Sequence, residues 1–192
     1  MFTRQEIIAA ALKLTRKGGM SALTARALGT ELGSSSRPVF GLFKNMEEVQ
    51  QEVIKAADEL YQSYLKEDME CGKYPPYKAS GMAYIRFARE EKQLFKLLFM
   101  RDRSREKVEE NRAEIQPLLE IIRQQLGLGE EDAYCFHLEM WVYVHGIATM
   151  LATSYLEMDE EFISRVVTDG YEGMKARYLS ARYTAPAVHE GL

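Results

Sequence analysis

The stretch LTARALGTELGSSSRPVFGLFKNMEEV, residues 23–49, decides how this chain is interpreted. Thr24 precedes a short helix-forming run and suits an N-cap, because its hydroxyl can accept a free backbone N–H. Gly33 stands where a helix ends in the left-handed conformation. One of the first two serines can cap the next helix. If that serine is Ser35, Pro38 falls in the first turn, where a missing N–H costs little. A helix, a tight glycine turn and a second short helix form the helix-turn-helix pattern.

The rest of the chain also predicts helices, and no segment predicts a strand. Thr3 and Glu6 form a capping box, and apolar residues at helical spacing follow it until Gly18 and Gly19. We therefore expect an all-α protein of about nine helices. Three of them form the N-terminal unit, at about 3–17, 24–32 and 36–42. The later helices are expected at about 46–70, 77–90, 92–100, 112–126, 131–156 and 160–180.

Charge is distributed unevenly along the chain. Residues 1–46 hold seven Lys or Arg against two Glu, a net charge of +5, whereas the remainder holds eighteen against twenty-seven acids, a net charge of −9. A basic segment on an acidic chain predicts a polyanionic partner for one end only. No apolar run reaches the ~18 residues of a membrane helix, and the N-terminus lacks a secretory cleavage site. We expect a cytoplasmic protein with no membrane partner.

The expected DNA contacts come from the two short helices. The second presents small polar residues and Arg37 at its N-terminal end, which meets base edges and phosphates in helix-turn-helix proteins. Arg37 can form two hydrogen bonds to guanine or hold a phosphate. Thr24 and Arg26, at the start of the preceding helix, suit backbone phosphates. Phe40 is expected either to touch a thymine methyl group or to lie in the core. The expected DNA-binding residues are Thr24, Ala25, Arg26, Ser34, Ser35, Ser36, Arg37, Pro38, Phe40, Lys44 and Asn45.

A second group lies in the C-terminal half, where His137, Trp141 and His145 share one helix face. Three interpretations stay open: a metal site, for which no third ligand is identified, an effector pocket, and packing or a dimer contact. The pocket interpretation names Tyr84, Phe87, His137, Trp141, Tyr143 and His145 as ligand-binding residues. The sequence holds no nucleotide-binding, nucleophile-elbow or metalloprotease motif. We expect no catalysis, no cofactor and no bound metal.

These features resemble the TetR family of bacterial transcriptional regulators. Family members show a run like T…A..LG.S…LY.HF..K..L. Two residues depart from it: Phe40 stands where tyrosine is usual and Met46 where lysine is usual, so a hydroxyl and a cation are missing. The segments YIRFAREEKQLFKLLFM, residues 84–100, and WVYVHG, residues 141–146, resemble one group of the family's C-terminal domains, which has a Trp-x-x-x-His-Gly signature. The residues that match the family's N-terminal run are Thr24, Leu28, Gly33, Ser35, Phe43 and Val49.

The resemblance implies a helix-turn-helix DNA-binding domain over 1–46, a helical ligand-binding and dimerisation domain over 47–181, and a loose tail over 182–192. It implies a homodimer, paired through the helices at 131–156 and 160–180, that binds a palindromic operator in double-stranded DNA. It further implies a repressor that a small apolar or amphipathic effector releases. The alternative is a helical protein-interaction module with a degenerate DNA-binding head. The two departures and the low isoelectric point of about 5.6 favour that alternative.

Overall fold

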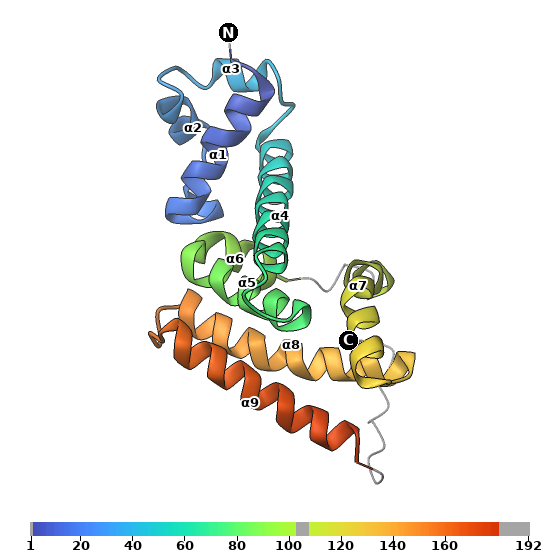
Figure 1. Cartoon of the computed structure of the whole chain (residues 1–192). Coiled ribbons are helices and arrows are strands. Elements are labelled where there is room, and N and C mark those ends of the chain that lie inside the picture. Colours follow the sequence, from blue (N-terminus) through green and yellow to red (C-terminus); the bar gives the residue numbers. More distant parts are fainter. Residues whose placement is uncertain (1, 103–107, 181–192) are drawn as a thin grey trace. The chain divides into compact units, whose positions relative to one another are not determined.

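The computed structural model describes residues 2–102 and 108–180, and for 108–112 only the backbone. These residues form nine α-helices, one 3-10 turn and no strand (Figure 1). The all-α class expected from the sequence is confirmed, while the expected tail lies outside the described residues. The helices are α1 Arg4–Gly18, α2 Ala25–Glu31, α3 Arg37–Phe40, α4 Met46–Glu70, α5 Pro76–Glu90, α6 Lys92–Phe99, α7 Val108–Leu126, α8 Glu130–Ala152 and α9 Glu160–Tyr178, and the 3-10 turn η1 is Met20–Ala22.

The chain divides into two compact units. The first, here called the head unit, comprises Met1–Tyr64 and Phe87–Arg101; the second, the body unit, comprises Leu65–Arg86 and Asp102–Leu192. Helices α4 and α5 contribute residues to both units, and α6 belongs to the head unit. The division groups residues by compactness. The functional boundary expected at residue 46 therefore stays a prediction.

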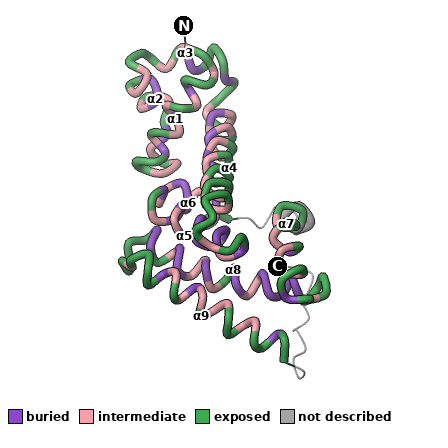
Figure 2. Tube along the Cα trace, in the orientation of Figure 1, coloured by how far each residue is buried: buried purple, intermediate pink, exposed green. Residues whose placement is uncertain are grey.

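The head unit has its own apolar core, seen as the buried positions of α1 to α4 in Figure 2. Its helix α1 begins at the expected capping box, in which the Glu6 N–H donates to Thr3 Oγ1 at 3.2 Å and Glu6 Oε2 accepts from the Thr3 N–H at 2.8 Å. Leu97 of α6 packs against the same core. The buried members of the core are Ile7, Ala11, Leu23, Leu28, Val39, Phe43, Val49 and Val53.

The turn between α2 and α3 follows the expected pattern at its first half. The Ala27 N–H donates to Thr24 Oγ1 at 3.1 Å, so Thr24 caps α2. Gly33 has φ +65°, and the next N–H, that of Ser34, returns to the Gly29 carbonyl at 2.9 Å. A Cβ on Gly29 would lie 2.9 Å from the backbone of Ser35. Gly29 therefore permits the turn to pass close over α2.

Helix α3 differs from the expectation in its cap and its length. The residue at the N-cap is Ser36, not one of the two preceding serines, and its side chain makes no capping hydrogen bond. Ser35 Oγ accepts only a long contact of 3.4 Å from the Arg37 N–H. The helix ends at Phe40 instead of 42, because the N–H groups of the next residues turn back to the Val39 carbonyl. Pro38 still occupies the first turn, as expected.

In the body unit α8 and α9 lie side by side, and α7 packs against α8 (Figure 1). Helix α8 ends at Ala152, four residues before the expected end, because Ser154 adopts a left-handed conformation with φ +56°. The Tyr155 N–H then donates to the Met150 carbonyl at 2.9 Å and closes the helix. None of the described helices is both long enough and apolar enough to cross a bilayer.

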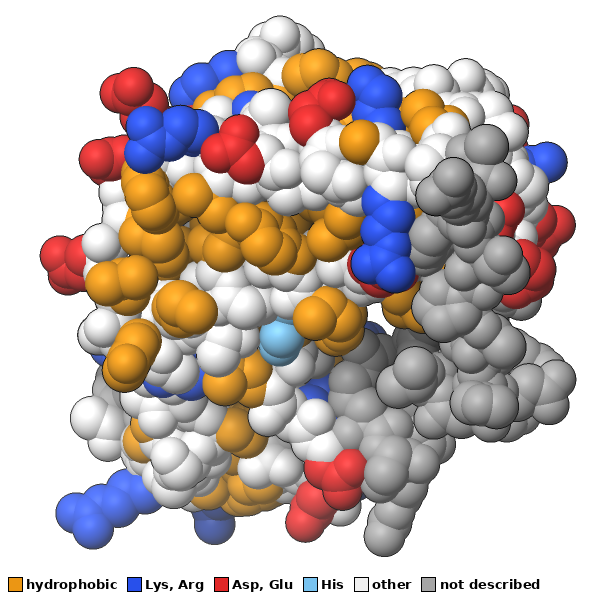
Figure 3. All heavy atoms as spheres, turned by 90° about the horizontal axis from the view of Figure 1, so that it is seen from below, with side chains coloured by type: hydrophobic (Ala, Val, Ile, Leu, Met, Phe, Trp, Pro, Cys, Tyr) orange, Lys and Arg blue, Asp and Glu red, His pale blue; other side chains and the backbone are white. Residues whose placement is uncertain are grey.

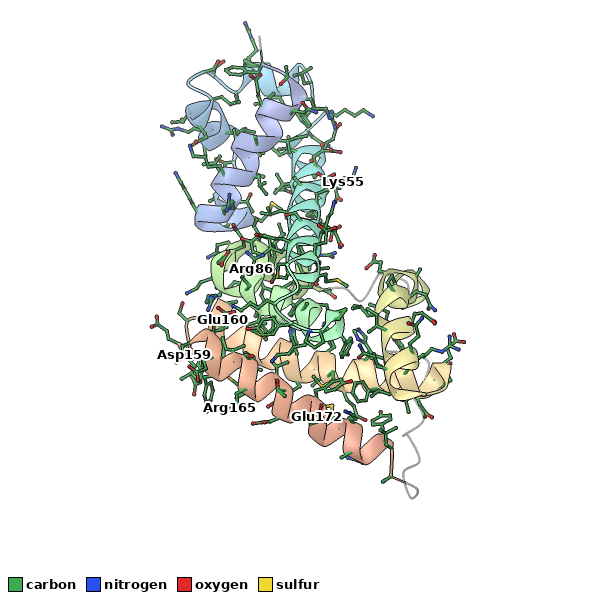
Figure 4. The ribbon with its side chains drawn as sticks, viewed as in Figure 1. Lys55, Arg86, Asp159, Glu160, Arg165 and Glu172 are labelled. Carbon is green, nitrogen blue, oxygen red and sulfur yellow. The ribbon has the colours of Figure 1, made fainter. Side chains whose placement is uncertain are left out.

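Helix α8 is not buried on all sides, although its sequence is apolar nearly all round. Val142 is 64% exposed and Trp141 is 41% exposed, whereas Phe136 and Ala148 are fully buried. The outer surface of α8 and α9 therefore keeps apolar side chains in contact with solvent. Figure 3 shows hydrophobic side chains gathered on the face of the body unit that is seen from below.

Candidate nucleic-acid interface

Three of the seven Lys and Arg side chains within residues 1–46 form ion pairs with acidic residues. Arg4 is the first, since its Nη2 lies 2.9 Å from Glu48 Oε1 and its Nη1 donates to the Leu42 carbonyl at 3.0 Å. Its guanidinium also lies 4.2 Å from the ring centre of Phe43. The hydrogen bond to Glu48 raises the pKa of Arg4. Arg4 thus ties the start of α1 to the turn that leads from α3 into α4.

The other two paired cations also lie on α1. Lys13 forms an ion pair with Glu31 of α2. Arg16 forms a two-point pair with Glu91, in which Nε donates to Oε2 at 2.7 Å and Nη2 contacts Oε1. The Glu91 side chain is only 5% exposed. These pairs fasten α1 to α2 and α6, so their positive charges are engaged in structure.

Arg26 and Arg37 are different, because neither forms an ion pair with any residue that the structure describes. Both side chains are exposed, one on α2 and the other at the first position of α3. Lys44 is exposed as well, and its backbone N–H donates to Glu48 at 2.7 Å. Among residues 1–46, the basic side chains without a described ion pair are those of Lys17, Arg26, Arg37 and Lys44. Lys17 lies on α1, and the other three lie on the helix-turn-helix or directly after it.

The remaining predicted DNA-binding residues surround these cations along the chain. Thr24 and Arg26 border a groove of about 480 Å³ between α1 and α2, which Leu14 and Thr30 also line. Thr24, Ser34, Ser35 and Asn45 are exposed, whereas Ala25, Ser36 and Pro38 are half-buried.

Phe40 had two interpretations, and the structure separates them. Its side chain is 47% exposed, so it does not belong to the core. Leu42, two residues later, is 43% exposed and was not singled out from the sequence. No local pattern distinguishes Leu42 from the buried residues around it. The end of α3 and the turn that follows it therefore expose apolar side chains that are able to contact DNA.

In the body unit the structure brings together three of the six residues predicted to bind a ligand. The Tyr84 hydroxyl lies 2.8 Å from His145 Nδ1, joining α5 to α8. The His145 ring stacks on Trp141, with ring centres 4.9 Å apart and planes 23° apart. Burial lowers the pKa of His145. Tyr84, Trp141 and His145 form what we call the aromatic cluster.

The other three predicted residues lie elsewhere. His137 is 8% exposed and its Nδ1 lies 3.1 Å from the hydroxyl of Tyr77, a residue that sequence reasoning missed. Burial lowers the pKa of His137 to about 4. The Tyr143 hydroxyl donates to a carbonyl of α9 at 3.3 Å. Phe87 is fully buried in the head unit, where its ring packs against Tyr61. No group of three or more potential metal ligands occurs among the described residues.

Comparisons with known proteins agree with this geometry. Residues 77–169 match the family model described as "Tetracyclin repressor-like, C-terminal domain". A search of curated proteins found no match. Among solved structures, the crystal structure of a TetR-like transcriptional regulator from Rhodococcus sp. RHA1 superposes with a TM-score of 0.64 at 14% identity. That superposition covers 95% of this chain and 100% of the other. At this level of identity the likeness concerns the fold.

Proposed function

We propose that this chain, whose residues 77–169 match the tetracycline repressor-like C-terminal domain, is a TetR-like transcriptional regulator. In this proposal it binds a palindromic operator as a homodimer and represses transcription until a small effector releases it. The observation that carries the DNA-binding part is the distribution of charge in the head unit. Arg26 and Arg37 are exposed and have no acidic partner among the described residues, whereas Arg4, Lys13 and Arg16 are paired.

The roles of the two available arginines differ in the proposal. Arg37, at the start of α3, enters the major groove and bonds guanine O6 and N7. Arg26 lies on α2 and holds a backbone phosphate, together with Thr24. Ser34, Ser35, Ser36, Lys44 and Asn45 provide further contacts along the same segment. A contact to a base edge carries sequence information, and a contact to phosphate carries affinity alone.

A selection from random duplex DNA, followed by anisotropy titrations across a salt series, tests this proposal. We expect an enriched palindrome whose half-sites lie about 34 Å apart, and an affinity that falls steeply with salt. Arg37→Ala should weaken binding and relax the sequence preference, whereas Arg26→Ala should weaken all sequences about equally. Lys66→Ala is the matched control, because Lys66 is an exposed cation outside the helix-turn-helix. If both arginine variants bind like the parent, the proposed contacts are wrong.

Dimerisation is proposed through the outer surface of α8 and α9. Val142 and Trp141 of α8 and Phe162 of α9, which is 40% exposed, are apolar and reach solvent there.

Light scattering on purified protein tests the dimer. Val142→Glu places a charge in the centre of the proposed interface and should shift the mass from two chains to one. Met100→Glu is the matched control, since Met100 is 42% exposed in the head unit. A parent protein that is monomeric at micromolar concentration, or a Val142→Glu variant that stays dimeric, rejects this surface.

The effector site is proposed at the aromatic cluster of the body unit. An amphipathic ligand suits a surface that offers stacking on Trp141 and a polar Tyr84–His145 pair. Such a ligand can act only by binding one conformer more tightly than another, with a coupling of about 1–3 kcal/mol. Thermal-shift screening identifies candidate ligands, and Tyr84→Phe should lower the affinity of those that need the polar pair. A ligand that releases the operator and binds the variant equally well lies elsewhere.

The alternative function is a protein-interaction module whose head no longer binds DNA. The exposed Phe40 and Leu42 are the observation that favours it, since apolar side chains at a surface suit a protein partner. The two functions separate in the same titration. A module of this kind shows no salt-dependent binding to any duplex.

A further inference from the structure

The recognition segment, residues 34–42 with the sequence SSSRPVFGL, offers a narrow choice of base contacts. Helix α3 itself contains one side chain that can form hydrogen bonds, that of Arg37. The segment contains no Asn or Gln, the residues that pair with adenine, and no Asp or Glu, which accept from cytosine. Apart from the serines, this segment can therefore recognise bases only through a hydrogen bond from Arg37 to guanine and through apolar contacts.

Phe40 is placed for that apolar contact. It follows Arg37 by three residues, so the two side chains emerge from the same side of the helix. Val39, which is 0% exposed, turns to the other side of α3 and into the head core, and Phe43, which follows the helix and is 2% exposed, joins it there. The 47% exposure of Phe40 therefore arises on the side of α3 that also presents the available cation.

Within the major groove, the apolar group that a base edge presents is the C5 methyl of thymine. On the basis of the proposed DNA-binding function, we propose that Phe40 reads the thymine methyl group at a base pair next to the guanine bound by Arg37. Three residues of α-helix rise about 4.5 Å, and successive base pairs are separated by about 3.4 Å. The two side chains therefore match adjacent base pairs.

The residue type at this position fits the assignment. Phenylalanine has no hydroxyl with which to bond a phosphate, so a phosphate gains nothing specific from its ring. The ring of Phe40 also lacks a place in the core, which Val39 and Phe43 fill. An exposed aromatic ring beside an available arginine loses its contact with water when a methyl group covers it, and that burial favours binding.

The test replaces thymine by deoxyuridine, which pairs identically and lacks only the methyl group. Each thymine of the selected operator is replaced in turn, at both half-sites, and binding is measured by anisotropy. One position should lose about fourfold in affinity for each methyl group, and hence about fifteenfold for the two half-sites of a dimer. Phe40→Ala should bind the thymine and deoxyuridine duplexes equally, because the ring that distinguishes them is gone.

Two matched variants exclude a general effect on the head. Leu42→Ala removes a neighbouring exposed apolar side chain and should keep the thymine preference. Phe40→Tyr keeps the ring and should keep it as well. The inference is overturned if the parent binds both duplexes equally at every thymine, or if Phe40→Ala retains the preference. Either result leaves salt-dependent palindrome binding intact, whereas the absence of such binding overturns the proposed function and this inference together.

Discussion

Two glycines of α9 make opposite demands, although they are separated by only three residues. A Cβ on Gly170 would lie 2.8 Å from Cε1 of Tyr143 and 3.1 Å from its Cδ1 and Cζ, whereas a Cβ on Gly173 meets nothing within 4 Å. The Tyr143 ring cannot move freely, because its hydroxyl donates to the Val166 carbonyl at 3.3 Å. Gly170→Ala therefore tests the packing contact with Tyr143, and Gly173→Ala in the same helix serves as its control.

The magnitudes follow from two effects. Alanine is favoured over glycine within a helix by about 1 kcal/mol, and both variants gain this. Gly170→Ala also overpacks the contact with Tyr143, which costs about 1–3 kcal/mol. Gly173→Ala should therefore be stabilised by about 1 kcal/mol, and Gly170→Ala should be less stable than it by about 2 kcal/mol. In a chain of this size that difference separates the midpoints of thermal unfolding by about 4–8 °C.

Circular dichroism melts at one fixed protein concentration measure the difference, since dimerisation makes the midpoint depend on concentration. The double variant Tyr143→Ala/Gly170→Ala removes the ring that the new methyl group strikes. It should show a favourable coupling relative to the sum of the single variants. Equal shifts for Gly170→Ala and Gly173→Ala, or strict additivity in the double variant, would refute the packing argument.

Three further substitutions probe other contacts. Arg16→Met leaves the Glu91 carboxylate buried without its partner, and because Arg16 is half-exposed we expect the free energy of unfolding in urea to fall by about 2–3 kcal/mol. The double variant Arg16→Met/Glu91→Leu should restore most of this loss. Additive losses in the double variant would contradict the argument. Burial lowers the pKa of His137 to about 4 in the folded protein, below its unfolded value of about 6.5, so the unfolded chain binds the proton first as pH falls. The free energy of unfolding should therefore fall by about 3 kcal/mol between pH 6.5 and pH 4. A His137→Gln variant with the same pH profile as the parent would reject this prediction. Met46→Lys adds a cation at the start of α4, where Met46 is half-buried against the head core, and should steepen the salt dependence of DNA binding by about one counterion per subunit; an unchanged slope places that residue away from phosphate.

The sequence predicted those parts of the fold that short-range chemistry determines. Thr3 and Thr24 cap helices because their hydroxyls reach backbone N–H groups within three residues. Gly33 ends α2 because it adopts a positive φ without strain. Ser154 escaped prediction because it takes the same left-handed conformation with a side chain that rarely adopts it, and α8 therefore ended earlier than expected.

The sequence predicted which residue types form the candidate site, but it could not show which of the basic side chains are free of ion pairs within the protein. Arg4, Arg16, Arg26 and Arg37 look alike in the sequence. Their partners separate them, since Glu48 lies 44 residues from Arg4 and Glu91 lies 75 residues from Arg16. Such pairs depend on how the helices pack. The same cause explains Phe87, whose spacing suited the aromatic cluster and whose ring instead lies in the head unit.

The composition of the head unit bears on how such a protein can be recombined. Residues 87–101 belong to this unit, although the chain leaves it at Tyr64 and returns only after the start of α5. A fragment cut at residue 46 or 64 would lack Glu91, the partner of Arg16, and would uncover the side of α1 that α6 packs against. Exchanging DNA specificity between relatives by a single crossover therefore separates α1 from its own α6. An exchange that transfers residues 1–64 and 87–101 together preserves the contacts between α1 and α6.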